Sequence, residues 1–208
     1  MVVAFIADLI DEGAEAATAR ARQLSLRRFS AWLAEEGEID QDELLGIKPP
    51  KLDVKIIQPL TDDDLCALIK ACSGLDPFRD RRDEAIIRVM LETGLRAGEL
   101  VEMTISDTNL AAGEAIVRRG KGGKGRIVPL GPQSVRALDR YIRARRAHRL
   151  ADTDALWLGD RGKAFSYYGL HRTLRMRADV AGVVNFHPHR LRHTAAHRWL
   201  APADPKAA

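Results

Sequence analysis

The sequence predicts a mainly α-helical protein with a small antiparallel β-sheet, an α+β fold. Most of its 208 residues fall into segments whose apolar side chains recur at helical spacing. The clear exception is residues 114–130, where two short β-branched runs flank a turn of glycine and lysine. Apolar residues make up 46% of the chain, which is enough for a globular core.

Residues 1–45 predict helices. The stretch "TARARQLSLRRFSAWLAEEG" places apolar residues at near-helical spacing and closes on Gly37. These apolar residues are Leu24, Leu26, Phe29, Trp32 and Leu33. The prolines at positions 49, 50 and 59 then forbid a continuous helix. We therefore expect a helical appendage over 1–48, an extended linker over 49–60 and a larger domain over 61–208.

In the larger domain, Thr61 and Asp64 form a capping box that starts a helix running to about Cys72. "RDRRDEAIIRVMLETGL" predicts an amphipathic helix with Ile86, Ile87, Met90 and Leu91 facing inward and a stop at Gly94. "RAGELVEM" predicts a short helix. "EAIVRRGKGGKGRIVPL" predicts a β-hairpin.

The rest of the chain returns to helix. "PQSVRALDRYIRARRAHR" has Val135, Leu138, Tyr141 and Ile142 on one face, and "ALWLG" predicts a short buried segment. "YGLHRTLRMRADVAG" and "HPHRLRHTAAHRWLA" are the last two helices, the second with Pro188 in its first turn.

Composition excludes several classes of protein. No apolar run approaches the roughly 20 residues that span a bilayer, and the N-terminus lacks the basic region of a signal peptide. We therefore expect no membrane partner and a cytoplasmic location. Cys66 and Cys72 predict buried, reduced side chains within one helix, and no Cys/His set has zinc-ligand spacing.

The net charge of +4 hides an asymmetry. Residues 1–113 carry 13 Lys and Arg against 22 Asp and Glu, a balance of −9. Residues 114–208 carry 20 against 7, a balance of +13. A half this basic favours a polyanionic partner such as nucleic acid, although a solvated basic face has the same composition.

Three motifs could bind or act on an anion. In "ETGLRAGEL", Glu99 lies three residues after Arg96 and can hold its guanidinium in place, as in an anion site or in an ordinary surface ion pair. In "RRGKGGKGRIVPL", Lys121 lies between glycines at the hairpin tip, where it could enter a DNA groove, donate a proton or simply be solvated.

The third motif is "HPHRLRH", in which His189 and Arg192 project from one helical face. One group exchanges a proton near neutral pH and the other keeps its charge, a combination that suits phosphoryl transfer. A buried core histidine is the alternative. A metal site is disfavoured because carboxylates are absent there and the arginines would repel a cation.

Together these motifs resemble the tyrosine recombinase or phage integrase family. "TGLRAGEL" is similar to the family's first box, "GKGGKGRIVPL" to its lysine hairpin and "HPHRLRH" to its second box, in the family's order. The resemblance covers about residues 55–200, the catalytic domain less its end. "TARARQLSLRRFSAWL" resembles part of the family's DNA-clamping, or core-binding, domain.

The resemblance implies roles for these residues. Arg96 and Arg192 would bind the non-bridging oxygens of the scissile phosphate, Lys121 would protonate the departing 5′ oxygen, and His189 would act as acid and base, with Glu99 supporting Arg96. Further hairpin residues would contact duplex DNA: Arg118, Arg119, Lys124 and Arg126. The resemblance implies no metal and no cofactor, and a partner that is duplex DNA, bound as a homo-oligomer or together with an intact recombinase.

The family's nucleophile is a tyrosine well beyond the second arginine, and none of the 16 residues after Arg192 is a tyrosine. Tyr141, Tyr167 and Tyr168 lie upstream and do not match its motif. We therefore expect the site to be incomplete, through truncation or because a partner supplies the tyrosine in trans. A non-catalytic DNA-binding module that modulates an intact recombinase is the alternative. A further alternative is a helical interaction protein without DNA affinity. In that case the presence of the first box, the lysine hairpin and the second box would be a coincidence.

Overall fold

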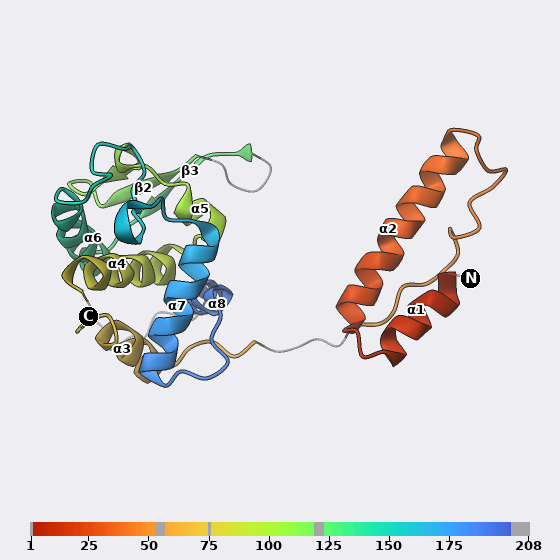
Figure 1. The fold of residues 1–208 in the computed structure, drawn as a ribbon, viewed down its shortest axis with the longest axis horizontal. Coiled ribbons are helices and arrows are strands. Elements are labelled where there is room, and N and C mark those ends of the chain that lie inside the picture. The colour runs from red at the N-terminus through yellow and green to blue at the C-terminus, as the bar shows by residue number, and fades with distance from the viewer. Residues whose placement is uncertain (1, 53–56, 75, 119–122, 201–208) are drawn as a thin grey trace. The chain divides into compact units, whose positions relative to one another are not determined.

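The computed structural model describes residues 2–52, 57–74, 76–118 and 123–200. The chain forms two compact units, residues 1–56 and 57–208 (Figure 1). Helices dominate both units, and the second also contains a three-stranded antiparallel sheet. The predicted fold class is confirmed.

The first unit contains helices α1 (Val2–Asp11) and α2 (Ala16–Glu35), packed around a small apolar cluster of Ile6, Leu9 and Ala19. The predicted helix is present, but its apolar residues do not form the buried face. Phe29 and Trp32 are exposed and stack on each other. Gln23 is buried instead, and its amide nitrogen donates a hydrogen bond to the Lys48 carbonyl oxygen.

The second unit carries the remaining elements. Its helices are α3 (Asp62–Lys70), α4 (Pro77–Thr93), α5 (Ala97–Val101), α6 (Pro132–Arg145), α7 (Tyr167–Ala181) and α8 (Pro188–Leu200). Its strands are β1 (Thr108–Asn109), β2 (Glu114–Val117) and β3 (Arg126–Pro129). Short 3₁₀ turns cover Ile105–Asp107 and Asp160–Gly162.

The helix boundaries follow the signals in the sequence. Thr61 and Asp64 exchange two backbone-to-side-chain hydrogen bonds of 3.1 Å, which confirms the capping box at the start of α3. Gly94 ends α4 in the left-handed conformation, with φ of 61°. α4 packs against both α6 and α8, so its position determines where the two later helices lie.

The hairpin is also confirmed. β2 pairs antiparallel with β3, with Ala115 opposite Val128 and Val117 opposite Arg126. Ala115 and Val117 are buried and Ile116 is exposed, the alternation expected of a half-buried strand. β1 adds a third strand of only two residues, too short for any pattern to predict. The tip, with Arg119 and Lys121, lies outside the described residues.

The main core lies between α3, α4, α6, α7, α8 and the sheet. The predicted buried segment "ALWLG" belongs to it: Leu156, Trp157 and Leu158 are buried. Tyr141 stacks on Trp157 and donates a hydrogen bond of 3.0 Å to the Leu156 carbonyl oxygen, and burial raises the pKa of Tyr141 to about 12. This tyrosine is therefore part of the core.

The prediction for the cysteines is half wrong. Cys72 is buried, but Cys66 is exposed, since Leu65 and Leu68 supply the buried face of α3 and Cys66 points away from it. Among the described ranges, no helix is both long and apolar enough to cross a membrane.

Candidate phosphate-binding site

Arg96 is positioned by the turn between α4 and α5. Gly94 ends α4, the fully buried Leu95 anchors the turn in the core, and Arg96 follows as the residue that precedes the first turn of α5. The Arg96 side chain is 45% exposed. A buried neighbour thus fixes the backbone while the guanidinium reaches solvent.

Glu99 holds this arginine from the first turn of α5. Its carboxylate accepts hydrogen bonds from the Arg96 backbone N–H at 2.9 Å and from Arg96 Nη1 at 3.0 Å. Glu99 itself is nearly buried. Both the main chain and the guanidinium of Arg96 are therefore held by one carboxylate; the spacing predicted the contact with the guanidinium but not the one with the main chain.

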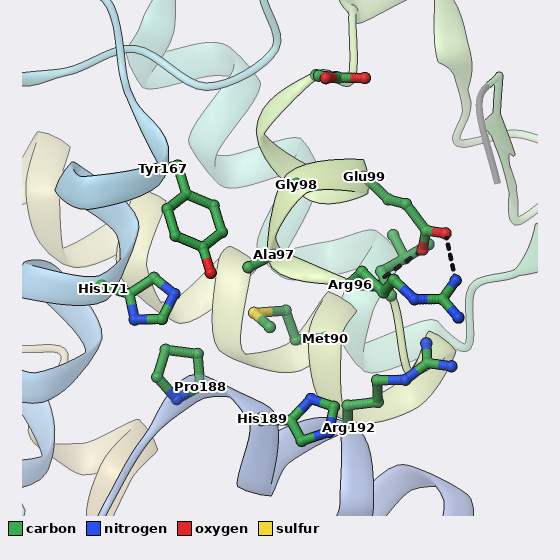
Figure 2. Close-up of a pocket in the computed structure, with 12 residues that line it drawn as sticks. Met90, Arg96, Ala97, Gly98, Glu99, Tyr167, His171, Pro188, His189 and Arg192 are labelled. Carbon is green, nitrogen blue, oxygen red and sulfur yellow. Dashed lines mark hydrogen bonds and ion pairs between the residues drawn. The ribbon is translucent and has the colours of Figure 1, made fainter. Parts of the chain in front are cut away.

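Arg192 and His189 come from α8, whose buried residues Leu191 and Ala195 pack it into the core. Arg192 Nη1 donates a hydrogen bond to the Gly94 carbonyl oxygen, so α8 is joined to the turn that carries Arg96. His189 lies one helical turn before Arg192. Figure 2 shows the guanidinium groups of Arg96 and Arg192 on the same side of a pocket, with His189 beside Arg192.

This pocket has a volume of about 650 Å³, and Arg96, Glu99, His189 and Arg192 all line it. An adjoining cavity of about 430 Å³ is lined by Arg96 and Arg192 again, together with Arg126 from β3 and Trp199 from α8. Arg96 and Arg192 therefore line both cavities. The structure brings residues from the first and second boxes into one concave site.

The electrostatics favour an anion. Burial alone would raise the pKa of Glu99, but hydrogen bonds from Arg126 and Arg96 lower it to about 2. Burial, the neighbouring His193 and the charges of Arg192 and Arg96 lower the pKa of His189 below its ordinary value. At neutral pH the Glu99 carboxylate is therefore charged, and the His189 imidazole is neutral beside the guanidinium groups of Arg96 and Arg192.

The remaining predicted residues belong to the hairpin sequence. Arg118 forms an ion pair with the buried Asp107, and Arg126 forms one with Glu99. Lys124 is exposed. Lys121 and Arg119 lie outside the described residues. Two of the hairpin arginines are thus engaged in ion pairs within the protein.

Two aromatic side chains on the far side of the pocket were not predicted as site residues. Tyr167 and His171 lie on α7, with ring centroids 4.5 Å apart, and face the pocket opposite the arginines (Figure 2). Ser166 places them by capping α7 at the Gly169 N–H. The spacing of four residues puts both on one helical face, a signal visible in "YYGLH". That spacing alone does not reveal what the face contacts.

This arrangement can bind a phosphodiester. Arginines offer planar, charged donors to phosphate oxygens, and an imidazole beside them can exchange a proton. No group of three or more His, Cys, Asp or Glu side chains within the described part of the chain is placed to hold a metal ion.

Comparison with known proteins decides the family. The profile of the phage integrase family matches residues 58–204, which include the whole of this site. The chain belongs to the phage integrase family.

Curated members of this family are similar along most of the chain. Tyrosine recombinase XerC of Corynebacterium glutamicum is 31% identical over 192 residues, covering 92% of this chain and 61% of that protein. XerC of Thermodesulfovibrio yellowstonii is 33% identical, covering 96% of this chain and 68% of its own. The chain therefore spans about three fifths of the length of the first relative.

Solved integrase structures share the fold. The crystal structure of XerA recombinase matches with a TM-score of 0.63 and 30% identity, over 86% of this chain and 69% of that chain. A lambda integrase tetramer bound to a Holliday junction matches with a TM-score of 0.76 and 22% identity, over 99% of this chain and 60% of that chain.

Proposed function

We propose that this chain binds duplex DNA and positions a scissile phosphate for strand transfer by a site-specific tyrosine recombinase. The observation that carries the proposal is the meeting of Arg96 and Arg192, which are far apart in the sequence, on one wall of a concave site beside His189. The identity to XerC along most of the chain supports it.

In the proposed reaction, Arg96 and Arg192 bind the two non-bridging oxygens and offset the charge that develops on the phosphate. Glu99 keeps Arg96 oriented, so little reorganisation is needed when the transition state forms. His189 exchanges a proton at the reacting oxygens, and Lys121 protonates the departing 5′ oxygen. The attacking group is a tyrosine of the assembled recombinase, which conserves the phosphodiester energy in a 3′-phosphotyrosyl bond.

We assign the parts of the chain accordingly. Residues 61–208 belong to the catalytic domain, residues 49–60 form the linker and residues 1–48 belong to a DNA-clamping domain. The start of the family match at residue 58 and the separate compaction of residues 1–56 support this division. On DNA, we expect the chain to assemble with further copies or with an intact recombinase.

Affinity for duplex DNA should fall steeply with salt. Each phosphate contact releases condensed counterions, so a plot of log affinity against log salt gains a slope of about −0.9 per contact. With several basic side chains engaged, we expect a slope of about −3 or steeper, measured by fluorescence anisotropy with a labelled duplex. Affinity that is flat between low and physiological salt would contradict the proposal.

DNA binding should strengthen as pH falls from neutral toward the pKa of His189 in the free protein, which lies below the ordinary value of histidine. The pKa of His189 is lowered in the free protein, so the imidazole is neutral at pH 7. A bound phosphate favours the charged form, and binding therefore takes up a proton, which a lower pH promotes. Anisotropy titrations across pH should show this gain. His189→Gln should reduce it, whereas His197→Gln, on the exposed end of the same helix, should leave it in place.

A further inference from the structure

Arg126 occupies an unusual position for a DNA-contacting residue. It is the first residue of β3, next to the hairpin, but its side chain points toward α5 rather than extending freely. Nη1 donates to Glu99 Oε1 at 3.1 Å and Nη2 to Glu99 Oε2 at 2.8 Å. This is a bidentate pair in which both terminal nitrogens of the guanidinium are used.

The same carboxylate holds Arg96. Oε1 accepts from Arg96 Nη1 as well as from Arg126, and Oε2 accepts from the Arg96 backbone N–H as well as from Arg126. The nearly buried Glu99 carboxylate therefore accepts two hydrogen bonds from Arg126 and two from Arg96.

The charges of the neighbouring arginines also support a role for Arg126 in this site. Arg126 and Arg96 share one carboxylate, and Arg192 lies close by: burial, the charge of Arg96 and that of Arg126 lower the pKa of Arg192. All three arginines line the cavity of about 430 Å³. Without Arg126, the Glu99 carboxylate would lose two of its four hydrogen bonds, draw Arg96 more strongly to itself and leave the site less positive.

We propose that Arg126 is a positioning residue, which orients the phosphate-binding guanidinium of Arg96 by fixing Glu99. The inference rests on the proposed function, because it assigns Arg126 a part in the same phosphate site. It differs from a direct DNA contact, in which Arg126 itself would donate hydrogen bonds to a phosphate in addition to those it gives Glu99.

A double-mutant cycle on DNA affinity separates these two roles. Arg126→Gln is measured by fluorescence anisotropy in the wild-type chain and in Arg96→Ala. We expect a loss of about tenfold in the wild-type chain, as for one charged hydrogen-bonded contact, and less than about twofold in Arg96→Ala. Arg126→Lys should recover little, because an ammonium group cannot form the bidentate pair.

Arg118→Gln is the matched control. It removes the same charge from the neighbouring strand end, and Arg118 pairs with Asp107 rather than with Glu99. Its effect should be equal in the two backgrounds. Glu99→Gln removes the charge of the carboxylate but keeps the shape of the side chain. Adding Arg126→Gln to this variant should weaken DNA binding little further. Circular dichroism of each variant checks that the fold is retained.

Each outcome has a clear meaning. If Arg126→Gln weakens binding equally with and without Arg96, or if Arg126→Lys restores the affinity, then Arg126 contacts DNA directly and the inference is overturned. If the wild-type chain does not bind duplex DNA at low salt, the proposed function itself fails. Wild-type binding that depends on Arg96 but shows no coupling to Arg126 rejects this inference alone.

Discussion

Arg177→Met is expected to destabilise the second unit by about 3–5 kcal/mol, the usual effect of removing one partner from a buried ion pair. Arg177 is fully buried on α7 and donates from Nε to Asp83 Oδ2 at 2.8 Å and from Nη1 to the Ala71 carbonyl oxygen at 2.7 Å. Burial by itself lowers the pKa of Arg177, but the Asp83 carboxylate raises it, so the guanidinium is charged. Methionine would leave Asp83 buried with Arg82 as its remaining charged partner.

Urea denaturation followed by circular dichroism measures this effect. The matched control is Arg175→Met, an exposed position on the same helix, which should change stability by less than about 0.5 kcal/mol. A loss in Arg177→Met no larger than that in Arg175→Met would show that the buried network contributes little. This network also joins α7, which carries Tyr167 and His171, to α4, which ends at the Arg96 turn.

Arg192→Ala is expected to weaken DNA binding by about 1–3 kcal/mol, or roughly 5- to 150-fold in Kd. Two things are lost together: a charged donor to the phosphate and the hydrogen bond that ties α8 to the Gly94 carbonyl oxygen. The salt slope should also become shallower by about 0.9, since one phosphate contact disappears. Anisotropy titrations at several salt concentrations measure both quantities.

Arg198→Ala is the control for the loss of charge alone. Arg198 lies on the same helix, near its exposed end, and pairs with Asp62 outside the pocket. Its replacement should lower affinity far less than that of Arg192. Equal effects of the two substitutions would indicate that α8 contributes only general positive charge and that the pocket does not hold a phosphate.

Local signals in the sequence predicted the elements well where one residue type dictates the backbone. Thr61 and Asp64 satisfy the free N–H groups of α3, and Gly94 adopts a left-handed conformation that other residues rarely take. The alternating pattern around residues 114–130 similarly required a hairpin. These preferences operate within a few residues, so they are visible without the rest of the chain.

The same signals failed where a distant contact decides burial. Apolar periodicity in α2 did not indicate that Phe29 and Trp32 are exposed, because periodicity describes a face and not what covers it. Cys66 and Cys72 lie in one segment, yet only the face that meets the core buries its cysteine. Buried arginines in α4 and α7 are equally invisible, since a charged residue in a helix ordinarily faces solvent.

By itself, the sequence determined the residue types of an anion site and their order in the first box, the lysine hairpin and the second box. That order indicated the family. Only the tertiary structure decided which groups meet: Arg192 with the Gly94 carbonyl, Arg126 with Glu99, and the α7 face of Tyr167 and His171 with the pocket that the arginines line. The physical reason is that hydrogen bonds and ion pairs act over a few ångströms in space, whereas these partners are held together by the packing of α4, α5, α8 and the sheet. The residue type determines the chemistry of a side chain, but the fold determines which groups that side chain contacts.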